Sequence, residues 1–108
     1  MGPWIVTTDE LGDASGLSIS LTVNSVAKQA SNTDQLIFTV PYLVSYLSRN
    51  TTLLPGAVIA TGTPGGVGFT REPPEFLRPG TLVELTIEGI GTLSNPLIGD
   101  RSATGSTR

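Results

Sequence analysis

The sequence predicts a mostly-β α+β fold with one main helix. Two stretches, residues 17–23 and 81–88, alternate between apolar and polar side chains, which is the period of a half-buried strand. A third stretch, after Thr39, spaces its apolar residues as a helix does. Pro-Gly pairs at 55–56 and 79–80 mark turns between these stretches. Together these observations predict five or six short strands and one helix.

The amino-terminal part is predicted to hold a helical turn and a β-hairpin. Thr7 and Glu10 have the spacing of a capping box, which would open one helical turn before Gly12. The first alternating stretch follows. Asn24-Ser25 then stands where a two-residue hairpin turn belongs, so we expect a return strand over about 26–31.

The helix is predicted from its start signal and its apolar face. The Thr39 side chain can cap the exposed amides, and Pro41 in the first turn gives up no intrahelical bond. The apolar face consists of Leu43, Val44, Tyr46 and Leu47. We interpret this face, together with Tyr42, as core or interface rather than as a cofactor site.

The second half is predicted to contain further strands. Residues 57–61 are interpreted as a short buried strand. After the second alternating stretch, Gly89 and Gly91 bracket a tight reversal into a strand over 92–97. Residues 99–108 have almost no apolar content, which predicts a flexible tail.

Length and composition limit the class of protein. A chain of 108 residues suits one domain with one modest core, burying about 65% of its unfolded surface. The net charge is −3 and the six Lys and Arg residues are scattered, which argues against binding to nucleic acid. No window has the roughly 18 apolar residues of a membrane span, and no basic leader is evident. We therefore expect a cytoplasmic protein.

The amino-acid types that are missing narrow the chemistry further. The chain has no Cys, which excludes disulfides, thiolate catalysis and Cys-ligated zinc within it. It also has no His, which excludes a Ser-His-Asp hydrolase within it. The amino-acid composition alone does not identify this protein as an enzyme.

The most distinctive stretch is residues 60–69, Ala-Thr-Gly-Thr-Pro-Gly-Gly-Val-Gly-Phe, which we call the glycine-rich loop. Glycine lets backbone approach a ligand, and Thr hydroxyls bind carboxylate or phosphate oxygens. The loop lacks the Gly-Lys-Ser/Thr ending of a P-loop. Two interpretations stay open: a structural turn, which spacing alone favours, and an anion-contacting loop.

Other chemistry-bearing residues have simpler interpretations. Asp9, Glu10 and Asp13 offer three oxygen ligands in five residues, but their spacing fits no EF-hand loop. A solvated loop or helix cap is therefore the favoured interpretation, and a metal site the alternative. Trp4, beside Gly2-Pro3, is expected to anchor the amino-terminal segment rather than to touch substrate.

Taken together and in order, the motifs resemble the carboxy-terminal half of the fumarylacetoacetate hydrolase family. The resemblance covers about residues 2–97, and we expect one such domain over 1–98. The segments that carry it are Gly2-Pro3-Trp4-Ile5-Val6-Thr7, Asp9-Glu10-Leu11-Gly12-Asp13, Ser31-Asn32-Thr33, Leu54-Pro55-Gly56, Val58 to Gly68, Pro79-Gly80 and Glu88 to Pro96.

The resemblance implies part of a mixed β roll that is normally dimeric. It also implies a metal-dependent enzyme of aromatic and amino-acid catabolism acting on small 2-oxo or 2-hydroxydienoic acids, by C–C hydrolysis, decarboxylation or isomerisation. In the family, Mg²⁺ or Mn²⁺ holds the keto and carboxylate oxygens and stabilises the enolate. Carried over to this chain, Thr63 would hydrogen-bond the substrate carboxylate and Gly62 would let the loop close on it.

The chain departs from the family pattern at the metal and at the acid/base groups. The family's Glu-x-Glu, its later Asp, its Lys and its His-x-x-Glu would all precede Met1, and nothing here replaces them. Lys28 does not match the catalytic lysine, and Phe38, Val40 and Leu43 match core positions. We therefore expect no catalytic residue and no metal ligand in this chain, which alone should be inactive.

Three functions remain as hypotheses. The first is a fragment or truncated gene product of a family enzyme, with catalysis by a separate amino-terminal half chain as a variant. A homo-oligomer is expected under this hypothesis and under the next one. The second is a non-catalytic interaction module, which would expose sheet edges and apolar surface and so self-associate. The third is a small-anion-binding protein that uses only the Thr63 loop.

Overall fold

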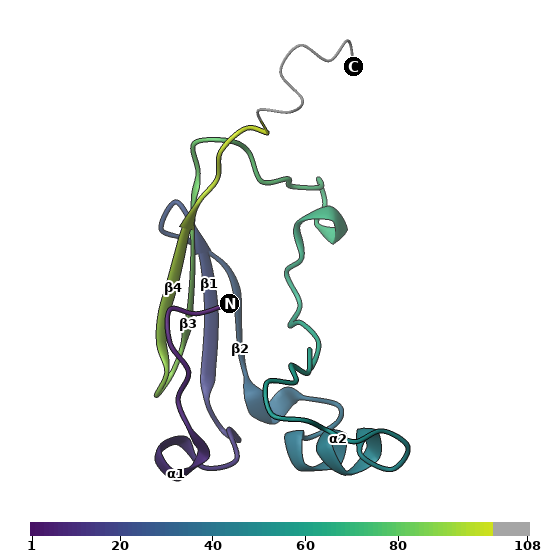
Figure 1. Cartoon of the computed structure of the whole chain (residues 1–108). Coiled ribbons are helices and arrows are strands. Elements are labelled where there is room, and N and C mark those ends of the chain that lie inside the picture. The colour runs from purple at the N-terminus through teal and green to yellow at the C-terminus, as the bar shows by residue number, and fades with distance from the viewer. Residues whose placement is uncertain (101–108) are drawn as a thin grey trace.

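The computed structural model describes residues 1–100, which form one antiparallel sheet with a helix standing apart from it (Figure 1). The strand order is β2-β1-β3-β4, and every neighbouring pair is antiparallel. The elements in chain order are α1 (Thr8–Leu11), β1 (Ser18–Val23), β2 (Val26–Asn32), η1 (Thr33–Gln35), α2 (Val40–Leu47), η2 (Gly68–Thr70), β3 (Leu82–Ile87) and β4 (Gly91–Pro96).

The first hairpin forms as predicted. Asn24 and Ser25 both have positive φ, 49° and 66°, as a two-residue turn of the mirror-image type requires. The β1–β2 ladder contains one bulge, because Leu21 pairs with Gln29 whereas Thr22 pairs with Ala27. Lys28 is thus the extra residue of β2, without a partner in the ladder.

The second hairpin is also confirmed, with β3 and β4 reversing at residues 88–90. The amino-terminal segment lies against this turn. The Trp4 indole Nε1 donates a hydrogen bond to the Ile90 carbonyl at 2.5 Å, and a Cβ placed on Gly91 would lie 2.5 Å from the indole ring. The predicted anchoring by Trp4 is therefore confirmed, and Gly91 is required because the ring passes so close.

Both helices form, but one cap differs from the prediction. Thr39 caps α2, since its Oγ1 accepts a hydrogen bond from the Tyr42 amide at 3.3 Å. The helical turn α1 also forms, yet the expected capping box at Thr7 is wrong. The Thr7 hydroxyl instead donates a hydrogen bond to the Asp9 carboxylate. A hydrogen bond to an ionised carboxylate is stronger than the bond that a capping hydroxyl would accept from a main-chain amide.

The predicted buried strand over 57–61 is wrong. These residues form an irregular, mostly exposed segment, and Val58 is 69% exposed. A short apolar run shows no alternation that would distinguish a strand from an irregular segment. In the structure these residues pair with no strand of the sheet. The described residues thus hold four strands rather than five or six. Their sheet is antiparallel, so the mixed pairing expected of the roll is not found within residues 1–100.

The expected single core does not form in this chain. No side chain of residues 1–100 is buried, and the chain exposes 8507 Å², against about 5,700 Å² for a compact protein of this size. The family core position Phe38 is 54% exposed, and Val40 and Leu43 are only half-buried. A single sheet with a detached helix has no second layer to bury its apolar face against.

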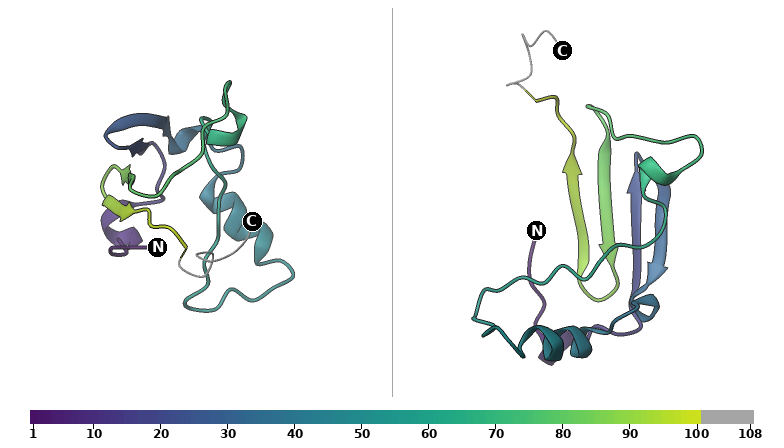
Figure 2. Two further views of the ribbon diagram at one scale, coloured as in Figure 1. Left: turned by 90° about the horizontal axis from the view of Figure 1, so that it is seen from above. Right: turned by 90° about the vertical axis from the view of Figure 1, so that its right-hand side faces the viewer.

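The connection from α2 back to β3 carries the glycine-rich loop alongside the sheet (Figure 2). Seen from above, α2 and this connection lie on one side and the sheet on the other. None of the helices in the described part is long and apolar enough to cross a membrane. The tail predicted for residues 99–108 lies outside the described residues from 101 onward.

Candidate functional site

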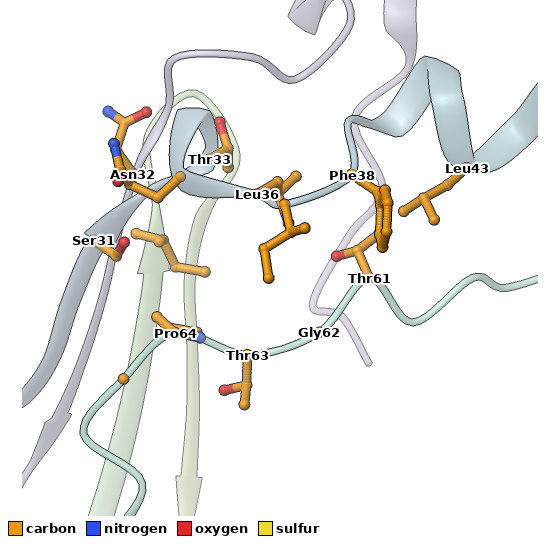
Figure 3. Close-up of a pocket in the computed structure, with 14 residues that line it drawn as sticks. Ser31, Asn32, Thr33, Leu36, Phe38, Leu43, Thr61, Gly62, Thr63 and Pro64 are labelled. Carbon is orange, nitrogen blue, oxygen red and sulfur yellow. The ribbon is translucent and has the colours of Figure 1, made fainter.

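A pocket of about 450 Å³ lies between the glycine-rich loop and the segment that joins β2 to α2 (Figure 3). Gly62 and Thr63, the two residues predicted to bind substrate, both line it. Its other wall brings the end of β2 and the start of α2 close to the loop. The lining residues are Ile19, Ser31, Asn32, Thr33, Gln35, Leu36, Ile37, Phe38, Leu43, Thr61, Gly62, Thr63, Pro64 and Gly65.

Three hydroxyl groups of this lining have no hydrogen-bond partner among residues 1–100. They belong to Ser31, Thr61 and Thr63. Thr33, by contrast, is used by the fold, because its hydroxyl accepts from one main-chain amide at 2.9 Å and donates to a main-chain carbonyl at 2.7 Å. The free hydroxyls of Ser31 and Thr61 are therefore polar groups that this pocket offers to a ligand, whereas the hydroxyl of Thr63 points to the opposite side of the loop.

The glycines of the loop serve two different purposes. Gly62 has φ +107°, and a Cβ there would meet nothing within 4 Å, so its position is open towards a ligand. At Gly66 (φ +98°) a Cβ would collide with the Lys28 carbonyl. At Gly68 it would collide with the main chain of Glu75. Gly66 and Gly68 thus have the structural role of allowing close packing. Gly62 does not, so the interpretation of the loop as anion-contacting stays open at that position.

The loop is tethered to β2 by two side chains that the sequence did not single out. The Gln29 amide Nε2 donates to the Pro64 carbonyl at 2.9 Å. Arg71 donates from Nε to the Gly66 carbonyl at 3.1 Å and from Nη2 to the Lys28 carbonyl. Partners 35 and 43 residues apart leave no local sequence signal, so neither contact was predictable from spacing.

Charged residues surround the tether. The Lys28 Nζ lies 2.7 Å from the Glu75 carboxylate, and the Arg71 Nε lies 4.0 Å from the same oxygen. The hydrogen bond from Lys28 lowers the pKa of Glu75 below its usual value, against the opposing effect of desolvation. Lys28 therefore takes part in an ion pair within the fold.

Thr63 stands between the pocket and a second, more open cavity of about 640 Å³. This second cavity has apolar walls from β1 and from residues 76–77, and Lys28 and Arg71 contribute to its lining. In Figure 3 the Thr63 side chain extends to the opposite side of the loop from Leu36. Its hydroxyl is thus presented on the side of the loop away from η1 and α2.

Asp9, Glu10 and Asp13 do not gather into a group of three potential metal ligands. The Asp13 carboxylate accepts hydrogen bonds from the Ser15 amide at 3.0 Å and hydroxyl at 2.6 Å, which lower its pKa. No group of three potential metal ligands exists within the described part of the chain. Residues 1–100 therefore do not fit the Mg²⁺ or Mn²⁺ that the resemblance implies.

Comparison with known proteins points to one family. Residues 1–98 match the family model described as fumarylacetoacetate (FAA) hydrolase C-terminal. The chain is similar to fumarylacetoacetate hydrolase of Exiguobacterium antarcticum, with 38% identity, a TM-score of 0.87 and coverage of 93% of this chain and 36% of that one. It is also similar to 2-hydroxyhepta-2,4-diene-1,7-dioate isomerase of Mycobacterium marinum, with 44% identity, a TM-score of 0.76 and coverage of 90% and 34%.

A third solved structure contains ligands. Maleylpyruvate hydrolase of Sphingobium sp. SYK-6, in complex with manganese (II) ion and pyruvate, is 35% identical with a TM-score of 0.79, covering 90% of this chain and 34% of that one. Curated relatives include a Staphylococcus saprophyticus protein 45% identical over 95 residues. The chain spans about a third of the length of the curated relatives that it matches.

Proposed function

The chain belongs to the fumarylacetoacetate hydrolase family and corresponds to its carboxy-terminal domain, and from this premise we propose that it forms the carboxylate-binding wall of a site for small 2-oxo or 2-hydroxydienoic acids. The reactions of such a site are hydrolysis, decarboxylation or isomerisation of acylpyruvate-type substrates. The observation that carries the proposal is the free hydroxyl of Thr63 beside Gly62, on a loop held in place by Gln29 and Arg71.

In this proposal the chain contributes binding and orientation. The Thr63 hydroxyl donates a hydrogen bond to one carboxylate oxygen of the substrate. Gly62, with its positive φ and open surroundings, lets the main chain approach the same group. The second cavity, which Thr63 also lines, contains Lys28 and Glu75, but these two side chains are paired with each other at 2.7 Å. Proton transfer is therefore assigned to groups outside residues 1–100.

The remaining parts of the site are proposed to come from another polypeptide segment. The related maleylpyruvate hydrolase binds Mn²⁺ and pyruvate, whereas the described part of this chain holds no group of three metal ligands. We propose that an amino-terminal half chain, or a second copy with such a half, supplies the metal ligands. Mg²⁺ or Mn²⁺ would then act as the Lewis acid when bound.

A chimera tests this function directly. Residues 1–98 replace the matching segment of the Exiguobacterium enzyme, and Mn²⁺-dependent turnover of an acylpyruvate is measured together with Mn²⁺ affinity. We expect activity, and Thr63→Ala should lower kcat/KM about tenfold or more, because a hydrogen bond to a charged group is worth about 1.5–3 kcal/mol. The matched control is Thr52→Ala, an exposed threonine away from the pocket.

The outcomes separate the parts of the proposal. A folded chimera that binds Mn²⁺ but turns over no acylpyruvate would contradict the proposed function. Equal activity of the Thr63→Ala and Thr52→Ala chimeras would contradict the role of Thr63. Mn²⁺ binding by the unaltered 108-residue chain would contradict the assignment of the metal ligands to another segment.

A second candidate function is a non-catalytic interaction module. It is favoured by the absence of buried side chains within residues 1–100 and by the exposed rings along α2. Size-exclusion chromatography with light scattering and thermal unfolding distinguish the two. One small oligomer that unfolds cooperatively supports the module, whereas an aggregating or molten chain supports a domain that needs its other half.

A further inference from the structure

The β-bulge at Lys28 and the side chain of Arg71 are joined by a hydrogen bond and act together on the glycine-rich loop. We propose that Arg71 is a positioning residue: it holds the Gly62–Gly66 segment against the bulge of β2 and so fixes where Thr63 presents its hydroxyl. The proposal rests on the proposed function only for what Thr63 binds. The holding of the segment stands on contacts within this chain.

The bulge makes the anchor available. Lys28 is the extra residue of β2, so it has no partner on β1, and its carbonyl accepts a hydrogen bond from Arg71 Nη2. Bulges re-aim groups that a regular ladder would consume. The Lys28 carbonyl is thus directed at the glycine-rich loop, and Gly66 packs on it so closely that a Cβ there would collide with it.

Arg71 links the glycine-rich loop to β2. Its Nε donates to the Gly66 carbonyl at 3.1 Å while its Nη2 donates to that of Lys28. One guanidinium therefore bridges the loop and β2. A lysine has no planar fork and does not offer two donors in this fixed geometry.

The segment after the loop holds Arg71 in place. The Gly68 carbonyl accepts from the Arg71 amide at 3.1 Å and from the Glu75 amide at 2.9 Å, which folds residues 68–75 back on themselves. The Glu75 carboxylate then lies 4.0 Å from the Arg71 Nε and 2.7 Å from the Lys28 Nζ. The guanidinium is thereby oriented by its own turn.

A second tether acts beside Thr63 itself. Gln29, which follows the bulged residue, donates to the Pro64 carbonyl at 2.9 Å. Thr63 immediately precedes this fixed point, and no hydrogen bond within residues 1–100 holds its hydroxyl. The loop is therefore fixed through Pro64 and Gly66, while the hydroxyl of Thr63 stays free for a ligand.

The experiment measures backbone order in the 108-residue chain labelled with ¹⁵N. Order parameters of the Gly62, Thr63, Gly65 and Gly66 amides are compared among the wild type, Arg71→Ala and Arg71→Lys. The control is Arg78→Ala, because the Arg78 side chain makes no hydrogen bond or ion pair within the described residues. We expect the order parameters to fall from about 0.85 to below 0.6 in Arg71→Ala. They should stay low in Arg71→Lys and remain unchanged in Arg78→Ala.

The outcomes decide whether the Arg71 guanidinium positions the loop. Unchanged order in Arg71→Ala, or full order in Arg71→Lys, overturns the positioning by the guanidinium. If Arg71→Ala also shifts the amides of β1 and β3, the Arg71→Lys variant, which keeps the charge and the aliphatic stem, provides the decision.

Kinetics of the chimera separate this proposal from the proposed function. Arg71→Ala should raise KM and leave Mn²⁺ affinity unchanged. A loosened loop together with an unaffected Thr63→Ala chimera would leave the positioning role standing and contradict the carboxylate site. A rigid loop in Arg71→Ala, together with a deficient Thr63→Ala chimera, would do the reverse.

Discussion

Asn24 and Leu82 are joined by two hydrogen bonds in opposite directions. The Asn24 amide donates to the Leu82 carbonyl at 2.9 Å, and the Leu82 amide donates to the Asn24 side-chain oxygen at 2.8 Å. A residue of the first hairpin turn thus pairs with the first residue of β3, 58 positions away. This pair fixes the register at the end of the β1–β3 ladder.

Replacing Asn24 with glycine should loosen this end of the sheet. Glycine keeps the positive φ of 49° but removes the side-chain acceptor, so about 1 kcal/mol should be lost. We expect the Leu82 amide to exchange its hydrogen about fivefold faster, measured by NMR. Asn50→Gly, in an exposed turn after α2, is the control, and equal exchange in both variants would contradict the role of the side chain.

Substitution with alanine should disrupt the loop at Gly66 but leave it in place at Gly65. In Gly66→Ala the new Cβ meets the Lys28 carbonyl at a strained positive φ, and we expect the loop to leave β2 at a cost of about 1–3 kcal/mol. In Gly65→Ala the Cβ enters open space. Loss of the nuclear Overhauser contacts between residues 66 and 28 is the measurement, and their survival in Gly66→Ala would contradict the close packing.

Acidification should weaken the Lys28–Glu75 contact. The pKa of Glu75 is lowered in the folded chain, chiefly by the hydrogen bond from Lys28. The stabilisation is therefore complete above the usual glutamate pKa and is lost as the pH falls through the lower, folded value. Carboxyl ¹³C shifts measure this titration. In Lys28→Met the pKa of Glu75 should return towards its usual value, and an unchanged value would contradict the stated cause.

The aromatic stack formed by Phe38, just before α2, and by Tyr42 and Tyr46 on α2 should drive self-association. Phe38, Tyr42 and Tyr46 stack in sequence with ring centroids 5.2 and 6.2 Å apart, and all three are about half exposed. Burying such a ring is worth about 1.5–3 kcal/mol, so Tyr42→Ser should weaken association at least tenfold in sedimentation equilibrium. Phe76→Ser, at an exposed phenylalanine away from this stack, is the control. Equal weakening in both would contradict a specific role of the helix.

Local signals account for what the sequence predicted. Alternation over 17–23 and 81–88, and the paired turn residues Asn24-Ser25, are properties of neighbouring residues, and each formed the expected element. Thr39 likewise capped α2 as expected. The glycine-rich loop was recognised from its composition, although composition did not separate Gly62 from the glycines that pack on β2.

The errors and omissions are non-local. The apolar run at 57–61 reads as a strand because hydrophobicity alone does not reveal whether a neighbouring strand exists. The bulge at Lys28 is not indicated by the sequence of β2 and is seen only in how β2 pairs with β1. The contacts of Gln29 and Arg71 join residues 35 and 43 positions apart, and the missing core reflects the lack of a second layer. Tertiary geometry decides each of these.

The packing of Trp4 against Gly91 gives the chain a built-in optical probe. The sequence holds a single tryptophan, and its two tyrosines, Tyr42 and Tyr46, both lie on α2. Indole emission therefore reports whether the first residues stay seated on the β3–β4 turn. Excitation transfer from the tyrosines reports, in the same sample, how far the helix stands from the sheet. When another polypeptide docks between the two, the spectrum changes without any attached dye.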